Sequence, residues 1–390
     1  MQSEPEAHIL INGLSIGSGG GFTVGRELFR GIATARPNWL ITLVLIRGNR
    51  LHEELESSSL PSNCRILWAP PTTQNRFKRS RYERGPLVQW IHDNHADAVL
   101  QLNGMLIPGL QVPSLCHMQD PWPYRPEAWT GAKQRAIAWL KRRAHRRVLK
   151  QAAVVGWTSA YLRDVITGYH RITPARSEVF YNGIPDEWIG RAQSASASRE
   201  TSHRIITVSN VTHYKRQDVV VRALALLRRR PGLQDLTYQI VGQPTDGFDS
   251  ELRQLARSLH VEEQVKIEGR VDEQRLAECW REAGCFVLMS VCESFGIPAV
   301  EAMSFGVPVV TSDCCAMPEV CGDAAALSPV DDAEALADRI ERVLKDPDYA
   351  QQLRRNGFRQ VEKFRWGITA EKMALAMEKI LAPSQEVSAT

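Results

Sequence analysis

The 390-residue sequence lacks any run of about 18 apolar residues, the length that a membrane-spanning helix needs. Its first fifteen residues are acidic before they are apolar, unlike a secretory signal. The eight cysteines include no C-x-x-C pair and no histidine at zinc-finger spacing, and several lie inside apolar runs such as CFVLMS, residues 285–290. We therefore interpret them as reduced core residues, expect no metal site, and expect a cytoplasmic protein.

The sequence also has little net charge, +4, but that charge is unevenly distributed. Residues 76–84 contain five Lys or Arg and one acid, and residues 121–150 contain nine and one. Such basic segments in an otherwise acidic chain suggest an anionic surface or substrate, with nucleic acid and lipid headgroups both open. Hydrophobic residues make up 43% and charged residues 24%, which excludes a disordered tail protein or a coiled coil.

Short apolar, β-branched segments alternate with amphipathic helical segments, as in βαβ units around parallel sheets. The predicted strands of the first half are 8–16, 39–46, 64–70, 98–104, 114–120 and 154–159. Those of the second half are 204–211, 237–242, 265–269, 285–290, 308–313 and 324–329. Two similar series predict an α/β protein with two doubly wound, Rossmann-like domains that face each other across a cleft.

The boundary between the two predicted domains lies in residues 180–202, where Asn-Gly, a proline and a Ser/Ala tract interrupt the alternation. We assign residues 1–184 to an N-terminal, acceptor-side domain and residues 185–365 to a C-terminal domain. The last predicted helix, 366–381, has no strand after it and could pack back on the first domain.

A glycine-rich turn, Gly17 to Gly21, follows the first strand and leads into a helix. Glycine lets the backbone approach a phosphate at a helix N-terminus. The spacing is not G-x-G-x-x-G, and the second strand ends in Arg47 where a nicotinamide site would have an acid, so that cofactor is disfavoured. A tight turn without a ligand is the alternative.

The densest polar pattern is CESFGIPAVEAMSFGVPVV, residues 292–310, between two predicted strands. Pro298 fits a first helical turn and Gly306 fits a helix end, which predicts a helix over 298–305.

The N-terminus of this helix would present the amides of Phe295, Gly296 and Ile297 to an anion such as a diphosphate. Glu293 precedes the helix and Glu301 lies one turn inside it, which suits two hydroxyl-rich parts of one long ligand. A solvated acid or a helix cap is the alternative for either one.

A third segment, VSNVTHYKRQD, residues 208–218, follows the first strand of the second domain and opens its first helix. Lys215 would lie at that helix N-terminus, where a cation can neutralise phosphate. A solvated lysine is the alternative.

These segments resemble the retaining glycosyltransferases of family 4, the group 1 transferases with a GT-B fold. The resemblance rests on Glu293-x7-Glu301 with its FGIP core, EAMSFGVPVVTSD, MPEVCGDAA, the Lys215 helix and YNGI. It is strong over 204–345 and looser before 184. It implies a retaining hexosyltransferase that moves a sugar from a nucleotide sugar to a saccharide or lipid-linked saccharide, in cell-surface polysaccharide or lipopolysaccharide synthesis. The segments VSN-x4-K and MPEVCGDAA are similar to bacterial mannosyltransferases, which favours GDP-mannose over a UDP-sugar.

The resemblance also implies roles for single residues. Glu301 would bind the ribose hydroxyls, and Glu293 would bind hydroxyls of the transferred sugar. Lys215, with the amides of 295–297, would bind the diphosphate.

On the rest of the donor, the backbone near Arg270 and Val271 would hold the nucleobase, and Gly19, Gly20 and Gly21 would close on the diphosphate. The family often has Arg where Asn210 stands, so Lys215 would meet the phosphate charge alone or with Arg216.

On the acceptor side the family tends to have a His-Asp pair, whereas this chain reads His117-Met118-Gln119-Asp120. His117 and Gln119 share one strand face, so either could replace the usual histidine, and a core histidine is the alternative for His117. No carboxylate is placed as a nucleophile, so we expect front-side displacement; in an inverting enzyme His117 or Asp120 would be the base. No metal is required in this scheme, because Lys215 and the helix dipole supply the charge.

Residues 133–150, KQRAIAWLKRRAHRRVLK, predict an amphipathic basic helix with Ile137, Leu140, Ala144 and Val148 on one stripe. Such a helix is typical of a membrane-surface element and would place the protein peripherally on the inner face of the plasma membrane. A solvated helix packed on its own sheet is the alternative.

Three other functions are open from the sequence. A GT-B epimerase or phosphorylase would use the same donor site, and a non-catalytic sugar-nucleotide-binding protein would keep Glu301 but lack turnover. A nucleic-acid-binding protein would need aromatic residues among the cations, and residues 133–150 contain only Trp139.

Overall fold

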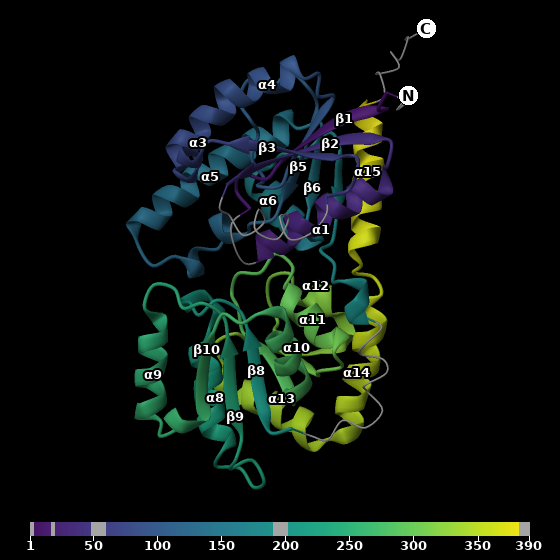
Figure 1. Cartoon of the computed structure of the whole chain (residues 1–390). Helices are drawn as coiled ribbons and strands as arrows, with labels where there is room; N and C mark the ends of the chain where they lie inside the picture. The colour runs from purple at the N-terminus through teal and green to yellow at the C-terminus, as the bar shows by residue number, and fades with distance from the viewer. Residues whose placement is uncertain (1–3, 17–19, 48–59, 190–201, 382–390) are drawn as a thin grey trace. The chain divides into compact units, whose positions relative to one another are not determined.

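The computed structural model describes residues 4–16, 20–47, 60–189 and 202–381 and divides the chain into two compact units (Figure 1). The N-terminal unit contains the described residues up to Pro123, Ala136–Asn182, and those from Trp366 onward. The C-terminal unit contains Tyr124–Arg135 and Gly183–Arg365. This division lies two residues before the boundary expected after residue 184.

The N-terminal unit is built on a parallel sheet with the strand order β3-β2-β1-β4-β5-β6-β7. Its strands are β1 (Ala7–Asn12), β2 (Trp39–Ile46), β3 (Cys64–Ala69), β4 (Ala98–Gln101), β5 (Ser114–Met118), β6 (Val154–Trp157) and β7 (Ser177–Val179). Strand β7 was not predicted, because its three residues have no apolar run. The other six match the predicted strands, which are apolar because both faces of the sheet are covered.

Helices cover both faces of this sheet. They are α1 (Gly20–Ala35), α3 (Arg76–Tyr82), α4 (Val88–Asp93), α5 (Ala132–Gln151), α6 (Ala160–His170) and α15 (Trp366–Leu381), and a π-helical turn (Glu83–Leu87) joins α3 to α4. The strand order reverses between β1 and β4. Because parallel crossovers are right-handed, α1 lies on one face and α3 to α6 lie on the other.

The last helix, α15, packs on α1 in the N-terminal unit (Figure 1). Gly31 permits this contact, since a Cβ built there would lie 2.5 Å from the Cβ of Ala370. Arg36 adds hydrogen bonds to Glu371 at 2.9 Å and to Glu378 at 2.5 Å. The final helix therefore belongs to the first unit although its sequence follows the second.

The C-terminal unit has a parallel sheet with the order β10-β9-β8-β11-β12-β13. Its strands are β8 (Arg204–Val208), β9 (Thr237–Val241), β10 (Val265–Gly269), β11 (Cys285–Leu288), β12 (Val309–Ser312) and β13 (Ala325–Ser328). Its helices are α8 (Gln217–Leu227), α9 (Phe248–Ser258), α10 (Glu273–Glu282), α11 (Ile297–Ser304), α12 (Met317–Cys321), α13 (Ala333–Lys345) and α14 (Pro347–Val361). The predicted α/β class with two Rossmann-like units is confirmed.

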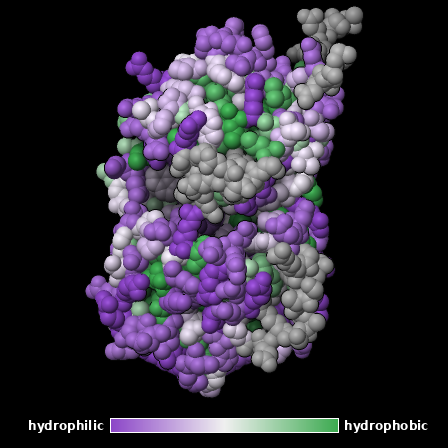
Figure 2. Space-filling model, in the orientation of Figure 1, coloured by the Kyte–Doolittle hydropathy of each residue, from purple (hydrophilic) through white to green (hydrophobic). Residues whose placement is uncertain are grey.

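All eight cysteines are free thiols; Cys64, Cys314 and Cys315 are half-buried and the other five are buried. Within the described ranges no group of three or more His, Cys, Asp or Glu is arranged to bind a metal ion. Those same ranges contain no helix with the length and apolarity to cross a bilayer. On the face shown in Figure 2, hydrophilic side chains cover most of the C-terminal unit.

Candidate active site

Polar residues gather in the C-terminal unit where the strand order reverses between β8 and β11. Open parallel sheets bind ligands beyond the carboxyl ends of their strands at such a reversal. Lys215 lies in a 3-10 turn (His213–Lys215) after β8, and Glu293 lies in the loop after β11. The Lys215 Nζ donates a hydrogen bond to the Glu293 carboxylate, and these side chains are only 13% and 12% exposed. The fold thus joins residues 78 positions apart in one nearly buried ion pair.

The charge state of Lys215 follows from this pairing. Burial is the largest single effect and opposes the charged ammonium. The charge and hydrogen bond of Glu293, with the electrostatic effects of Tyr214 and Cys292, together outweigh it, so the pKa of Lys215 is raised. The backbone reinforces the pair, because the Val291 N–H donates to the Tyr214 carbonyl at 2.9 Å. From the sequence, Lys215 was expected to bind phosphate and Glu293 to bind the transferred sugar. In the structure the two side chains form an ion pair with each other. An incoming anion would compete with Glu293 for the ammonium and release the carboxylate.

Helix α11 begins beside Glu293, at Ile297, one residue before the predicted start. Gly296 caps it in the left-handed region with φ +85°, and a Cβ built there would lie 2.7 Å from the Met317 Sδ, so the position requires glycine. The Phe295 ring is buried edge-on against Phe364 at a centroid distance of 5.1 Å. These contacts fix the backbone of residues 295–297 at the helix N-terminus, where the dipole favours negative charge.

Glu301 lies in the second turn of α11 and is half-buried. Burial, and then the negative charge of Glu273, raise the pKa of its carboxyl to about 7. None of the described residues donates a hydrogen bond to its side chain. Glu273 begins α10 three residues after exposed Arg270 and two after half-buried Val271, so the predicted nucleobase segment precedes the helix whose Glu273 acts electrostatically on Glu301.

Asn210, which stands where the family often has Arg, and Arg216, which was expected to help Lys215, are differently placed. Asn210 is exposed, and its backbone carbonyl accepts a hydrogen bond from the Gln217 side chain at 2.9 Å. Arg216 adopts φ +53° and forms an ion pair with Asp331 at 3.2 Å. Lys215 is therefore the cation paired at the reversal point, while Arg216 is directed to the loop after β13.

In the N-terminal unit the glycine turn is only partly described. Gly19 lies outside the described residues, whereas Gly20 and Gly21 are the first two residues of α1. A Cβ built on Gly21 would meet no atom within 4 Å, so the backbone there is accessible.

A polar cluster that the sequence reasoning missed lies at the reversal between β1 and β4. The Asn12 amide is fully buried and donates to Gln101 at 3.1 Å and to Glu83 at 3.0 Å. Burial raises the pKa of Glu83, against the hydrogen bond from Asn12 and the charges of Arg79 and Arg84. The available signal was the polar residue that ends each of two largely apolar strands, AHILIN and AVLQ.

His117, the predicted acceptor-side histidine, lies inside the unit. Its side chain is 0% exposed, and burial lowers the pKa of the imidazole to about 3. The ring packs edge-on against Phe180, and neither nitrogen hydrogen-bonds to a described residue. This environment fits the alternative, a core histidine, because Phe180 covers the strand face that was expected to be open.

Gln119 and Asp120 are half-buried beyond the end of β5. The Gln119 amide donates to the Leu102 carbonyl at 2.7 Å. Asp120 accepts from the Lys141 Nζ at 2.6 Å and from the Trp122 N–H at 3.0 Å. The catalytic assignment of Asp120 stays a prediction, and Lys141 is its structural partner.

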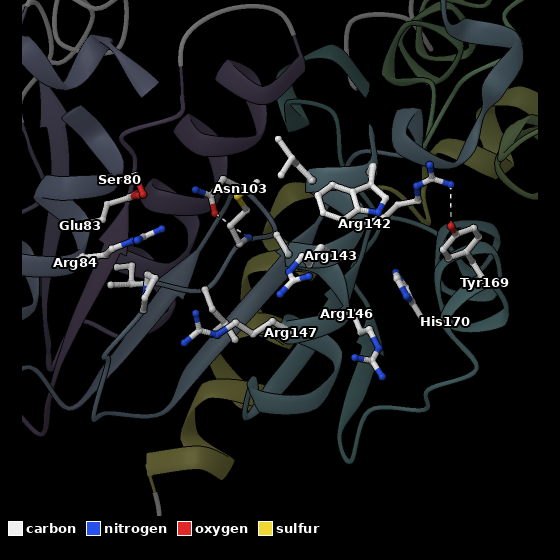
Figure 3. Close-up of a pocket in the computed structure, with 17 residues that line it drawn as sticks. Ser80, Glu83, Arg84, Asn103, Arg142, Arg143, Arg146, Arg147, Tyr169 and His170 are labelled. Atoms are coloured by element: carbon white, nitrogen blue, oxygen red, sulfur yellow. Dashed lines mark hydrogen bonds between the residues drawn. The ribbon is translucent and has the colours of Figure 1, made fainter. Parts of the chain in front are cut away.

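Helix α5 has a different inward face from the predicted stripe. The buried residues are Ala138, His145, Val148 and Leu149. Of the predicted stripe only Val148 is fully buried, and Leu140 is 58% exposed beside Trp139 at 57%. His145 is buried, although a polar residue was not expected on the inward face of the helix. Burial lowers the pKa of this histidine to about 4. The exposed apolar residues of α5 line a cavity of about 810 Å³, together with the α3 end, the loop after β4 and the end of α6 (Figure 3).

Residues 190–360 match the family described as Glycosyl transferases group 1. Residues 27–188 match the one described as Glycosyltransferase Family 4. This chain belongs to the group 1 glycosyltransferases of family 4. The match reaches both units and includes Lys215, Glu293 and Glu301.

Individual curated relatives of this glycosyltransferase match only part of the chain or share low sequence identity with it. A D-inositol 3-phosphate glycosyltransferase of Thermobispora bispora is 28% identical over 57% of this chain and 54% of its own length. Matches to the curated relatives span about half of those proteins or less.

Solved structures show the fold. Sucrose-phosphate synthase from Thermosynechococcus elongatus has a TM-score of 0.75 at 20% identity, over 97% of this chain and 100% of that one. Anabaena HepE, solved with UDP and glucose, has a TM-score of 0.73 at 18% identity, over 95% and 99%. The fold is GT-B, with two Rossmann-like domains.

Proposed function

We propose that this protein transfers a hexosyl group from a nucleotide sugar to a hydroxyl of a saccharide or lipid-linked saccharide, with retention, in cell-surface polysaccharide synthesis. The observation that carries the proposal is the Lys215–Glu293 pair beside the N-terminus of α11. A protonated lysine and a helix N-terminus together suit a diphosphate leaving group, which gains negative charge as the glycosidic bond breaks.

The same residues define a mechanism. The donor diphosphate takes Lys215 and the amides of 295–297, which frees Glu293 to accept hydrogen bonds from hydroxyls of the transferred sugar. Glu301, which receives no hydrogen bond from any described side chain, accepts from the ribose diol. The acceptor hydroxyl attacks the anomeric carbon on the face that the diphosphate leaves, and a diphosphate oxygen takes its proton. Substitution on that face keeps the anomeric configuration.

Asp120 is the N-terminal residue that we propose for the acceptor side. Its carboxylate is held by Lys141 and by the Trp122 amide, so it can accept a hydrogen bond from an acceptor hydroxyl at a fixed position. His117 has no such role in this proposal, because its ring is buried against Phe180.

The donor is a UDP- or GDP-sugar in this proposal. HepE is described in complex with UDP and glucose, which supports a uridine nucleotide, whereas the VSN-x4-K segment supports GDP-mannose. Thermal stabilisation by UDP-, GDP- and ADP-sugars distinguishes them, because a ligand at 100 times its Kd adds about 2.7 kcal/mol of stability. Release of nucleoside diphosphate then separates an enzyme from a sensor. Absence of both stabilisation and release would contradict the proposal.

We also propose peripheral attachment to an anionic membrane through α5. Its exposed Trp139 and Leu140 stand among cations, as in helices that lie in the headgroup region. The relevant cations are Lys141, Arg142, Arg143, Arg146 and Arg147. Their replacement by Gln should release the protein from anionic vesicles, since each cation near the surface contributes about 1 kcal/mol at low salt. Binding that does not respond to salt would contradict this attachment.

A further inference from the structure

Arginines from two separate elements line the cavity of the N-terminal unit. Arg84 comes from the π-helical turn before α4, and Arg143, Arg146 and Arg147 come from α5. In Figure 3 the guanidinium groups of Arg84 and Arg147 extend toward each other, and that of Arg143 lies to the right of both. The cavity holds about 810 Å³, within the size range of small-molecule sites.

Among the described residues, no ion pair balances the charge of these four arginines. None of these four arginines forms an ion pair with a described carboxylate; Arg147 donates to the Gln151 amide oxygen at 2.7 Å, and Arg143 lies over the Trp139 ring. The described lining residues include one carboxylate, Glu83, which accepts a hydrogen bond from Asn12. Clustered guanidinium groups repel one another, and a phosphate that bridges them removes that repulsion through bidentate hydrogen bonds.

Apolar residues line the same cavity. Leu106 and Ile107 come from the loop after β4, and Trp139 and Leu140 come from α5. Trp139 and Leu140 are more than half exposed, although they could have been polar at no cost to the core. A wholly polar ligand such as a free phosphate would leave this surface in water. An anionic group attached to an apolar chain would cover both kinds of lining.

We propose that this cavity binds the diphosphate group of an amphipathic acceptor, the diphosphate ester of a long apolar alcohol, with the arginines on the diphosphate and Trp139 and Leu140 on the chain. This proposal rests on the proposed glycosyl transfer, since it identifies the class of acceptor. The cavity also includes Asn103, in the loop that leaves the carboxyl end of β4. It therefore adjoins the strand-order reversal where such sheets bind their substrates.

Farnesyl diphosphate is the probe, and its binding to the full chain is measured by titration calorimetry without nucleotide sugar. Inorganic diphosphate and farnesol are the reference ligands. We expect saturable binding of one farnesyl diphosphate, about tenfold or more tighter than either reference, because each lacks one of the two contact types. Equal affinity for farnesyl diphosphate and inorganic diphosphate, or no binding of farnesyl diphosphate, would overturn the proposal.

Two charge-matched double variants on α5 test the location. Arg143→Gln/Arg147→Gln removes two cavity cations, and Lys133→Gln/Lys150→Gln removes two exposed cations outside it. We expect the first pair to weaken farnesyl diphosphate binding about tenfold or more and the control pair less than about twofold. An equal loss in both would show diffuse attraction to a basic helix and refute the site.

A third variant tests the apolar half of the cavity. Trp139→Ala/Leu140→Ala should weaken farnesyl diphosphate binding and leave inorganic diphosphate binding unchanged; a parallel loss of both would refute the assignment. Thermal midpoints of all variants verify folding. Release of nucleoside diphosphate is assayed separately. Its absence with intact farnesyl diphosphate binding would refute the proposed function alone, and the reverse result would refute this site alone.

Discussion

Replacing Glu301 with glutamine should make the protein more stable and its donor binding weaker. The side chain is half-buried in α11 with a pKa raised to about 7, and no described residue donates a hydrogen bond to its carboxyl. Gln has nearly the same shape without the charge, so Glu301→Gln removes the desolvation cost. The same change removes the charge-assisted hydrogen bonds that the carboxylate would accept from the ribose diol.

The magnitude follows from the pKa. A rise from 4.5 to about 7 corresponds to about 3 kcal/mol, at 1.36 kcal/mol for each pH unit. Below pH 4.5 the carboxyl is protonated in both the folded and the unfolded protein, so no penalty exists. Between 4.5 and 7 the unfolded chain releases its proton first, and the wild-type stability falls; above pH 7 the full penalty persists. The stabilisation by Glu301→Gln should therefore be near zero at pH 4.5 and about 3 kcal/mol at pH 8.

Urea unfolding of wild type and Glu301→Gln at several pH values measures the stability difference, and calorimetric titration with the nucleotide sugar measures affinity. We expect the free energy of donor binding to be about one to three kcal/mol less favourable in the variant, which raises the donor Kd. Wild-type donor affinity should also fall as pH drops below about 7, because protonation removes the acceptor.

Two results would refute this reasoning. A variant that is less stable than wild type at pH 8 would mean that the Glu301 carboxylate has compensating partners in the free protein. A stabilised variant with unchanged donor affinity would remove Glu301 from the nucleotide site while leaving its burial intact. A matched control is Glu273→Gln, which removes the neighbouring charge and should lower the pKa of Glu301 without deleting its carboxylate.

Three further outcomes are expected. Lys215→Ala should lower kcat more than donor affinity in steady-state kinetics, because charge on the leaving diphosphate grows toward the transition state; an unchanged rate would contradict its role. Gly296→Ala should cost about 1–3 kcal/mol in denaturant unfolding, since φ is +85° and the new Cβ would meet Met317, and wild-type stability would show that the turn adapts. NMR of the anomeric proton of the first product should show an α-linkage from an α-linked donor; a β-linked product would overturn the front-side mechanism and make Asp120 the candidate base.

The sequence by itself determined the strands and the class of the fold. Strands of a parallel sheet covered on both faces must be apolar throughout, so runs such as WLITLVLI identify them without knowledge of their neighbours. Local stereochemistry likewise determined α11, because Pro298 suits only a first turn and Gly306 adopts the positive φ of a helix end. Strand β7 was not predicted, because a strand of three residues is too short to show an apolar pattern.

Only the tertiary structure decided which polar groups meet. Lys215 and Glu293 are paired because β8 and β11 are neighbours across a strand-order reversal, which no local pattern encodes. Strand alternation placed His117 on a face, but Phe180, 63 positions later in the chain, decided that this face is buried. The inward side of α5 was likewise set by its packing on the sheet, which took His145 inward and left Leu140 and Trp139 exposed beside four arginines. Local sequence fixes backbone conformation through short-range sterics, whereas burial and ion pairing depend on contacts that only the folded chain creates.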